Sequence, residues 1–513
     1  MILLKKLKKV NNLFNFIYLF SHLLYRTNSI MEFATFPKNL QYKISQLSGH
    51  SKTCVKLTPD RNAVAKGETF KVKLPSNTIV DLRTLCFYAK GSCVSGTGDN
   101  LHFPRLTSSL IKTLSVYVNG TLVERIDNYN ILYNKLYDLD GGGIDQIAKR
   151  HLEIADPSVR YTLDGVFNHT TATPQITTRA STTDDTNRKL AITNWIGFLS
   201  SVSCPCLDTN DLGNIEVEIT LADEKVLFAG ANASANTTSA LDNPNWNLSD
   251  IHFTISKIVF NDPLYYNMKA SKLLSSGLQI GYSTYISSKG SVVDKSGSVN
   301  VNCTINSTSL DQLICCYNPE TPIIAPLQLF QSNSINTGLS FSQVLTGYGS
   351  DASGATLTDI GGQSSADIFH TSAGDLYNQS YFFKSDATGL STSSIEINNT
   401  PLAPQPLEDY EVFTESLIAL GNNNIDMAAG IFPGCRSLAD FLKYFFVHIV
   451  SLENIQNGEF YKSGLDGKSS ALNIVWKLAY NSSAVAMKQA PYIFAKCTRI
   501  IQVNEGNQIT IIV

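Results

Sequence analysis

The stretch Ser115–Leu139 reads SVYVNGTLVERIDNYNILYNKLYDL and fits two strands, a turn and a helix into one short segment. Val116 and Val118 alternate with their neighbours, as in a strand with one buried face. The Asn-Gly pair at 119–120 supplies the two positive-φ residues that a tight hairpin turn needs. A second short strand follows over 122–126, so the segment predicts a β-hairpin.

A short helix is expected directly after this hairpin. Asp127 can accept a hydrogen bond from a free amide of the first helical turn, which makes it the expected N-cap. Apolar side chains then recur with the helical period and form one stripe: Tyr129, Leu132, Tyr133 and Leu136. A surface on which Tyr129, Tyr133 and Tyr137 stack sugars or bases is the alternative, but helical spacing favours packing into a core.

A second copy of the segment lies at Ser394–Leu420 and reads SIEINNTPLAPQPLEDYEVFTESLIAL. Asn-Asn-Thr at 398–400 stands where the first copy has Asn-Gly-Thr, and Asp409 stands where the first copy has Asp127. The two copies are separated by close to half of the chain. The repeat therefore predicts two tandem domains of one fold.

Strand-like alternation of apolar and polar residues recurs in both halves. Alternating segments are 70–74, 215–221, 251–255, 299–305, 472–480 and 509–513, and two further strands are expected at 79–88, which is an apolar run, and at 310–317. We expect Gly91 to stop the strand that begins at Ile79, and we match the strand at Ile215 with the strand at Leu472. Long polar loops are expected at 168–187, 229–249 and 331–380.

Many short strands, frequent turns, one short helix per half and long loops are typical of β-sandwiches. The predicted fold class is all-β, and two tandem eight-stranded jelly rolls fit the length of the halves. A chain of 513 residues is too long for one core. We expect an N-terminal extension and arm at 1–60, a first jelly roll at 61–265 and a second jelly roll at 266–513.

Charge and cysteine content limit the chemistry. The formal net charge is −3 and 16% of the residues are charged, which argues against a general nucleic-acid binder because such a protein needs a basic face. None of the 10 cysteines belongs to a C-x-x-C pair. The spacings of Cys204 with Cys206 and of Cys315 with Cys316 do not fit common zinc sites. Buried reduced thiols are favoured over disulfides and metal ligands.

Residues 1–30 differ in composition from the rest of the chain. Lysines at 5–9 precede an interrupted apolar run over 13–25, which is too short and too polar to span a bilayer comfortably. Three interpretations stay open: an upstream start with Met31 as the true initiator, an internal arm or membrane-surface helix, and a signal or anchor.

No pattern predicts a catalytic, cofactor-binding or metal site. The Gly-Lys-Ser triplet at 467–469 lacks the first glycine of a P-loop and precedes a strand, so we expect a surface turn there. Asp184 and Asp185 are expected to be solvated carboxylates in a loop. Asp127 and Asp409 fit helix caps better than a catalytic pair, because they occupy equivalent places in separate domains.

Three segments carry a family resemblance: the hairpin and helix at 114–139, the corresponding element at 395–410 with its three prolines, and the Tyr-Lys-Ser-Gly-Leu-Asp turn at 461–466. In this order they resemble the double jelly-roll major capsid proteins of adenoviruses, large nucleocytoplasmic DNA viruses, virophages and polinton-like viruses. The sequence is more similar to the polinton-like and virophage groups than to adenovirus hexons, which are much longer. Residues 1–30 have no expected counterpart in the family.

The resemblance implies a structural protein and not an enzyme: a major capsid protein whose homotrimers form pseudo-hexameric capsomers of an icosahedral shell. Its expected location is the virion, with assembly inside the host cell. Its expected partners are copies of itself, neighbouring capsomers, and minor capsid and penton proteins. Specific nucleic-acid binding is not expected, and the N-terminal segment offers a contact to an internal membrane. The alternative is a secreted β-sandwich that binds carbohydrate or mediates adhesion, and a third hypothesis is a β-rich glycoside hydrolase with loop-borne carboxylates.

Overall fold

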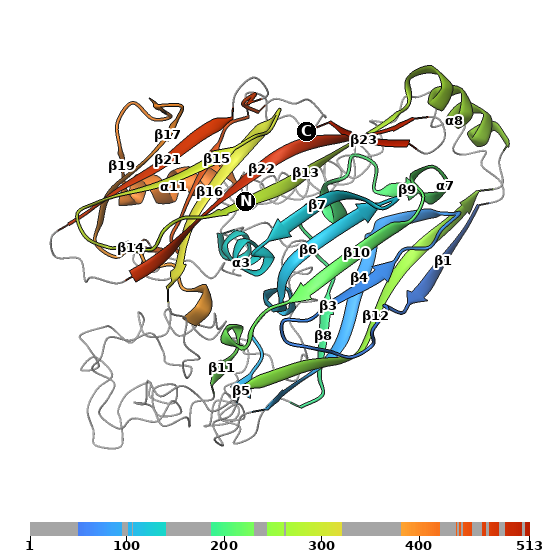
Figure 1. Ribbon diagram of the computed structural model, residues 1–513, viewed down its shortest axis with the longest axis horizontal. Coiled ribbons are helices and arrows are strands. Elements are labelled where there is room, and N and C mark those ends of the chain that lie inside the picture. Colours follow the sequence, from blue (N-terminus) through green and yellow to red (C-terminus); the bar gives the residue numbers. More distant parts are fainter. Residues whose placement is uncertain are drawn as a thin grey trace, which may run out of the picture. The chain divides into compact units, whose positions relative to one another are not determined.

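A computed structural model gives the fold (Figure 1). It describes residues 50–94, 101–139 except 105, 186–229, 244–260, 263–320, 381–420, 438, 441–442, 445–453, 464–467, 471–481, 488–504 and 508–512. Two compact units are present: Thr53–Ile258 with Ser271–Val513 form the larger, and Val259–Ala270 belongs to the smaller. Residues 1–30, the predicted loop at 331–380 and nearly all of the predicted loop at 168–187 lie outside the described residues.

The first half of the chain folds into two main antiparallel sheets (Figure 1). One has the order β1 (His50–Leu57), β12 (Asn245–Phe260), β4 (Ile79–Val94) and β8 (Arg188–Ile192), with β2 (Val64–Ala65) and β9 (Cys206–Asp208) attached. The other has the order β3 (Thr69–Lys73), β10 (Ile215–Leu221), β6 (Ile111–Val118) and β7 (Thr121–Asp127).

The second half repeats this arrangement. One sheet has the order β13 (Leu278–Lys289), β22 (Lys488–Asn504), β16 (Leu310–Pro319) and β20 (Val447–Ser451), with β14 (Val293–Asp294) and β23 (Gln508–Ile512) attached to β22. The other has the order β15 (Ser298–Ile305), β21 (Leu472–Tyr480), β17 (Leu390–Ile397) and β18 (Thr400–Pro401), with β19 (Leu407–Glu408) attached.

Short elements connect the strands. They are β5 (Leu101–His102), η1 (Thr107–Leu110), α3 (Tyr129–Leu139), α6 (Phe198–Ser201), α7 (Thr209–Leu212), η4 (Glu224–Val226), β11 (Phe228–Ala229), α8 (Pro263–Ser276), η7 (Tyr381–Phe383) and α11 (Asp409–Ala419). The expected boundary between residues 265 and 266 falls inside α8. The limits of the three predicted domains stay a prediction.

Strand order is the same in both halves. If the eight main strands of each half are numbered along the chain, one sheet reads 1-8-3-6 and the other reads 2-7-4-5. This is the order of a jelly roll, so the prediction of two tandem eight-stranded jelly rolls is confirmed. The predicted match of the Ile215 strand with the Leu472 strand also holds, because β10 and β21 are the seventh strands of their rolls.

The hairpins that revealed the repeat are present in both rolls. Asn119 and Gly120 have φ of 48° and 78°, and Val118 pairs with Thr121 across the turn. In the second roll, Asn398 and Asn399 have φ of 51° and 63°. Asparagine tolerates left-handed backbone better than other residues with a side chain, which explains how the second turn manages without glycine.

The predicted helix caps are wrong in both copies. Asp127 ends β7, and its carboxylate accepts hydrogen bonds from Thr113 and Arg125 instead of from the helix. The first turn of α3 begins one residue later, where the Asn128 carbonyl accepts from the Leu132 amide at 3.2 Å. In the second roll Glu408 is the N-cap and forms a capping box with Glu411.

Two strands are longer than predicted. Gly91 does not stop the strand that begins at Ile79, since β4 continues to Val94. The glycine is needed for packing, because a Cβ at this position would lie 2.7 Å from the Phe103 ring and 2.8 Å from Leu190. The second strand is β12, which begins at Asn245 and therefore includes the last residues of the predicted loop at 229–249.

The cores use the predicted apolar faces. Tyr129 and Leu132 are fully buried in α3 and Tyr133 nearly so, which agrees with core packing and not with an exposed stacking surface. The inward residues of β10 and β21 alternate with half-buried or exposed ones along each strand. The predicted strand segment at 509–513 corresponds to β23 (Gln508–Ile512), which pairs with β22.

Candidate functional site

The two rolls meet where β7 of the first roll contacts β13 of the second, as Figure 1 shows. Both strands lie at an edge of their own sheets. Tyr282 of β13 donates its hydroxyl hydrogen to the Val123 carbonyl of β7 at 2.9 Å. Its ring also contacts Phe198 of α6 edge to face, with the ring centroids 5.2 Å apart. We call this contact region the junction.

A buried carboxyl group occupies the junction. Glu124 is 1% exposed, and its Oε2 accepts a hydrogen bond from the Phe198 amide at 2.8 Å. Burial raises the pKa of Glu124 to about 8, although that amide, Thr284 and Arg499 favour the ionised form. A carboxyl group with this pKa is protonated at neutral pH. Burying it neutral avoids most of the cost of desolvating a charge.

Gly197 makes room for this carboxyl group. A Cβ at Gly197 would lie 2.3 Å from Glu124 Oε1, and the residue has φ of 78°, which L side chains rarely adopt. The glycine therefore serves two needs: it turns the chain into α6, and it lets the backbone approach Glu124 closely.

A serine-rich segment after α6 holds the edge of β13. The Ser203 amide donates to the Gly281 carbonyl at 2.8 Å, and the Gly281 amide donates back to Ser203 Oγ at 3.1 Å. The Ser283 amide donates to Ser201 Oγ at 2.8 Å. These bonds satisfy amides of β13 that would otherwise lie unpaired at the sheet edge, so the first roll caps the sheet of the second.

A lysine forms a second contact between the rolls. Lys135 of α3 is 1% exposed, and its ammonium group donates to the Phe383 carbonyl of η7. Burying an ammonium group is costly unless it is hydrogen-bonded. This bond and the junction therefore fix the two rolls to each other at separate places.

Inside the second roll, a polar bridge connects its two sheets. Ser393 Oγ of β17 lies 2.8 Å from His448 Nδ1 of β20, and Trp476 Nε1 of β21 donates to the same oxygen at 3.0 Å. Burial lowers the pKa of His448 to about 4, so the imidazole is neutral near pH 7. The three side chains therefore connect β17, β20 and β21 across the interior of the second roll.

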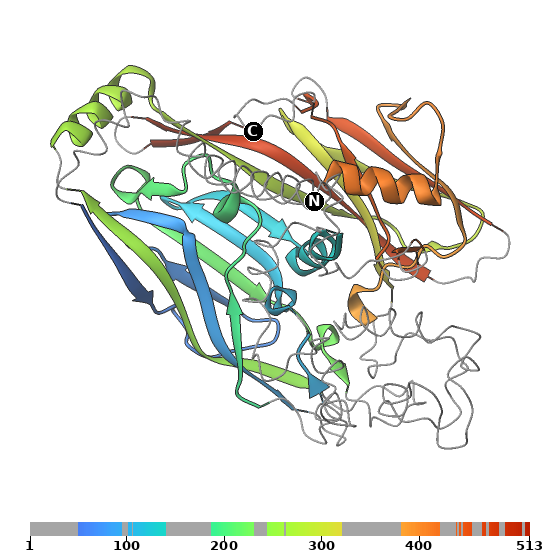
Figure 2. The same cartoon turned by 180° about the vertical axis from the view of Figure 1, so that it is seen from behind.

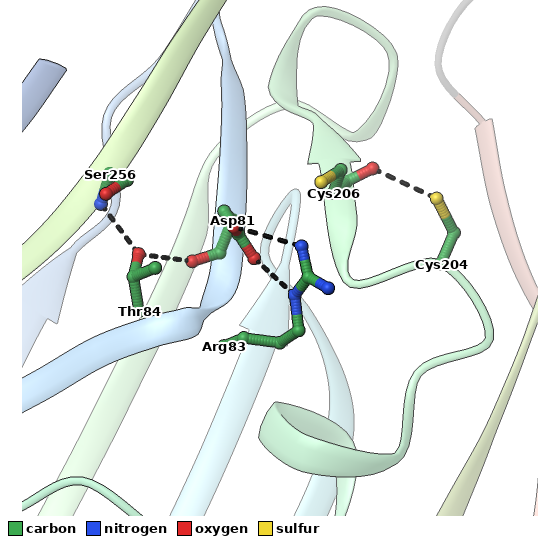
Figure 3. A network of polar contacts seen from close by, with 6 residues as sticks. All are labelled: Asp81, Arg83, Thr84, Cys204, Cys206 and Ser256. Carbon is green, nitrogen blue, oxygen red and sulfur yellow. Dashed lines mark hydrogen bonds and ion pairs between the residues drawn. The ribbon is translucent and has the colours of Figure 1, made fainter. Parts of the chain in front are cut away.

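A further polar network holds an irregular part of β4 (Figure 3). The Asp81 carboxylate binds Arg83 at 2.9 and 3.2 Å, and Thr84 Oγ1 donates to the Asp81 carbonyl at 2.7 Å. The Ser256 amide donates to Thr84 Oγ1 at 2.8 Å, at the point where the register between β4 and β12 shifts. The network replaces ladder hydrogen bonds that the shift removes.

The Cys-Pro-Cys segment borders this network. Cys204 Sγ donates to the Cys206 carbonyl at 3.2 Å (Figure 3). None of the nine cysteines that the structure describes forms a disulfide, and Cys435 lies outside the described residues. The prediction of buried thiols is correct for Cys303 and Cys316, where burial raises the pKa to about 12, and wrong for the exposed Cys54 and Cys204.

The structure describes only some of the residues that were considered for other chemistry. The expected surface turn at 467–469 is wrong for its first residue, since Gly467 is buried and its amide donates to the Ser307 carbonyl. Asp184 and Asp185 lie outside the described residues. Among the described residues no group of three or more His, Cys, Asp and Glu side chains could hold a metal ion. None of the helices in the described part of the chain is long and apolar enough to cross a membrane.

No protein-family model matches the chain. No curated protein matches it either. Solved structures do match. The structure of VP54 of PBCV-1, fitted into a reconstruction of the virophage Sputnik, is 11% identical, covers 91% of this chain and 97% of its own, and has a TM-score of 0.53.

Two further structures agree with it. A chain of a quasi-atomic model of the PBCV-1 virus capsid is 11% identical, covers 90% of this chain and 97% of its own, and has a TM-score of 0.52. A chain of the Sputnik virophage is 10% identical, covers 90% of this chain and 88% of its own, and has a TM-score of 0.50. This is the double jelly-roll fold of virus capsid proteins. The likeness extends over both rolls of the double jelly roll.

Sequence reasoning found the double jelly roll but missed the junction. Glu124 lies in the run Leu-Val-Glu-Arg-Ile, where a charged residue of an alternating strand is normally expected to face water. No local pattern distinguishes it from an exposed glutamate, because its burial depends on β13, far along the chain. Lys135 and His448 were missed for the same reason.

Proposed function

We propose that this chain is the major capsid protein of an icosahedral DNA virus and that it acts as a building block and not as an enzyme. The observation that carries the proposal is the strand order, which is the same in both rolls and is kept in a chain whose fold matches a virus capsid subunit over 90% of its length. A protein with two like rolls offers two like surfaces for lateral contacts.

The junction supports a building block in a second way. Buried groups from both rolls fill it, with Glu124 at 1% and Tyr282 at 1% exposed. Interfaces between domains that move are usually more polar and less completely buried. A rigid pair of rolls is what a shell subunit needs, because the contacts that it makes on either side must keep a fixed angle.

In this function three copies form a ring of six rolls, a pseudo-hexameric capsomer, and capsomers tile the shell with minor capsid and penton proteins at special positions. The protein is then located in the virion and is assembled inside the host cell. Closed rings of identical copies use heterologous contacts that leave no unpaired surface.

The test is the mass and shape of the purified full-length protein. Light scattering coupled to size-exclusion chromatography is expected to give three times the chain mass, and electron microscopy is expected to show six-lobed blocks. A monomer at all concentrations that binds glycans on an array would refute the capsid function and support the secreted adhesion protein. Glycosidase activity that is lost in Asp184→Asn or Asp185→Asn would support the hydrolase.

A further inference from the structure

Two cysteines on either side of one proline lie beside an arginine near the start of β4. Cys206 is the first residue of β9, and its register partner in β4 is Asp81. The Asp81 carboxylate binds the guanidinium group of Arg83, and the Cys206 side chain hydrogen-bonds the same group. Figure 3 shows Cys204 on the same segment as Cys206. We call the two cysteines and Arg83 the Cys-Pro-Cys site.

The backbone of this segment is held on both sides. The Leu82 amide donates to the Pro205 carbonyl at 2.9 Å, which continues the pairing of β9 with β4. The Ser203 amide donates to the Gly281 carbonyl of β13 at 2.8 Å. Figures 1 and 2 accordingly show β9 between β4 and β13. The two cysteines therefore keep fixed places in the folded chain, one on either side of Pro205.

Arg83 favours the thiolate form of Cys206. A guanidinium group has five N–H donors, and Asp81 accepts from two nitrogen atoms of Arg83, which leaves donors for the sulfur atom of Cys206. The hydrogen bond with Asp81 and, to a smaller extent, the contact with Cys206 raise the pKa of Arg83, so the group stays charged. A positive group in contact with a cysteine stabilises the thiolate, which is the nucleophilic form of the side chain.

Cys204 is placed to react with the sulfur atom of Cys206. Its side chain is exposed, and its Sγ donates to the Cys206 carbonyl at 3.2 Å, so the thiol reaches back across Pro205. Residues at this spacing have Cα atoms at most about 7 Å apart, and disulfides join Cα atoms about 4.4–6.8 Å apart. A segment that bends in this way can therefore accept a disulfide between its two cysteines.

Other thiols of the chain are less suited to reaction with a dissolved reagent. Burial raises the pKa of Cys303 and Cys316 to about 12, and it also raises the pKa of the half-buried Cys86. A thiol that stays protonated is a weak nucleophile. The Arg83 side chain is 68% exposed, so a small molecule can approach the Cys-Pro-Cys site from solvent.

We propose that Cys204 and Cys206 form a redox pair that exchanges with low-molecular-weight disulfides such as oxidised glutathione. The Cys206 thiolate attacks one sulfur atom of the small disulfide. A bond from Cys206 to one glutathione forms, the original S–S bond breaks, and the other glutathione leaves as a thiolate that takes up a proton. Cys204 then loses its proton to solvent, and its thiolate attacks the Cys206 sulfur and releases the second glutathione. Two thiols of the chain are thereby oxidised to one disulfide, while one small disulfide is reduced to two thiols.

The state of this pair follows the redox conditions around the protein. Thiols persist in a reducing compartment such as the cytosol, and disulfides persist in an oxidising one such as the extracellular space. In the oxidised pair the Cys206 sulfur is bonded to Cys204, so the network around Arg83 loses its contact with the thiolate. The inference goes beyond the proposed capsid function and does not depend on it, because every step takes place within one copy.

Thiol mapping of the full-length wild-type protein tests the pair. The reduced protein is incubated with oxidised glutathione without denaturant, remaining thiols are blocked with N-ethylmaleimide, and the tryptic peptide 190–225 is analysed by mass spectrometry. Cys204 and Cys206 are the two cysteines of this peptide. The peptide is expected to lose two hydrogen atoms and to take up no maleimide before the exposed Cys54 acquires glutathione. Dithiothreitol is expected to reverse the change. Modification of Cys206 no faster than that of Cys54, or glutathione on both cysteines of the peptide, would overturn the redox pair.

Single cysteine variants separate the two steps. Cys204→Ser is expected to stop the exchange after the first step, so that glutathione stays on Cys206. In Cys206→Ser, Cys204 is expected to react no faster than Cys54. A Cys204→Ser chain that releases its glutathione as the wild type does would show that Cys204 does not resolve the mixed disulfide, and it would contradict the pairing.

An arginine variant tests the activation of Cys206. Arg83→Gln is expected to slow the uptake of glutathione at Cys206 about threefold or more, because loss of the cation lowers the thiolate fraction more than it raises the nucleophilicity of the remaining thiolate. Arg125→Gln is the matched control, since Arg125 is 59% exposed and binds Asp127, two residues on, through the same kind of ion pair. An Arg83→Gln chain that reacts as fast as the control would overturn the role of Arg83 in the site.

Discussion

At the scale of single residues, the carboxyl group of Glu124 links the junction to pH. Its pKa is about 8 in the fold and near 4.5 in the unfolded chain. Because the folded pKa is the higher one, the neutral carboxyl stabilises the fold fully below about pH 4.5, and this stabilisation is lost as the pH rises through about 8.

We therefore expect the melting temperature of the protein to fall between pH 5 and pH 9, and Glu124→Gln to flatten this dependence, since glutamine keeps the shape without a titrating proton. Differential scanning calorimetry across that pH range measures the effect. Glu320→Gln, at an exposed site, is the control. A slope in Glu124→Gln equal to that of the wild type would show that the carboxyl group is ionised in the fold.

Gly120 and Gly197 have the same backbone angle, so substitutions at the two positions allow the cost of backbone strain to be distinguished from the cost of overpacking. Gly120 and Gly197 both have φ of 78°, but a Cβ at Gly120 meets nothing within 4 Å and one at Gly197 meets the Glu124 carboxyl group. We expect Gly120→Ala to cost about 1–2 kcal/mol of unfolding free energy from backbone strain alone. Gly197→Ala should cost about 1–3 kcal/mol more, because the junction is overpacked. Equal costs in urea denaturation would mean that Glu124 can move away freely.

At the scale of elements, His448 connects β20 to β17 and β21 across the interior of the second roll. Its pKa is about 4 in the fold against 6.5 in the unfolded chain. A lowered folded pKa means that the neutral imidazole stabilises the fold above about pH 6.5, and that this contribution is lost as the pH falls toward 4.

Acid unfolding tests this bridge. His448→Leu is expected to be less stable than the wild type at pH 7, because Ser393 loses a hydrogen-bond partner, yet to lose less stability between pH 6.5 and pH 4. His252→Asn, on the outer side of the first roll, is expected to keep the acid sensitivity of the wild type. Tryptophan fluorescence reports the transition through Trp476. If His448→Leu loses stability as steeply as the wild type, another group controls acid unfolding.

Features that depend on residues adjacent in sequence could be predicted from the sequence. Features that depend on contacts with residues far along the chain could not. The Asn-Gly and Asn-Asn turns fix both hairpins through backbone angles that few residues adopt, so they could be read directly. The caps failed because Asp127 is engaged by Thr113, a cross-strand partner that a local pattern does not reveal. The local pattern predicts a strand end at Gly91, although the role of this glycine is to admit the Phe103 ring from another element.

At the scale of the whole molecule, the two chain ends are expected to differ in importance. Deleting residues 1–30, which lie outside the described residues, is expected to leave oligomer mass unchanged, since their composition is unlike that of the rolls. Deleting residues 508–513 removes β23, which pairs with β22 from Ile500 to Asn504, and is expected to lower the melting temperature. Light scattering and calorimetry on both truncations measure this, and loss of the oligomer after the first deletion would make residues 1–30 part of the assembly.

The shared strand order of the two rolls limits how many rolls a ring of copies can contain. In the proposed ring, each copy brings one contact between rolls that is made during folding and one that is made only when another copy binds. A ring built in this way always holds an even number of rolls, in which contacts made by folding alternate with contacts made by binding. Concentration can therefore govern only every second contact, so a half-built ring comes apart into whole copies and never into single rolls.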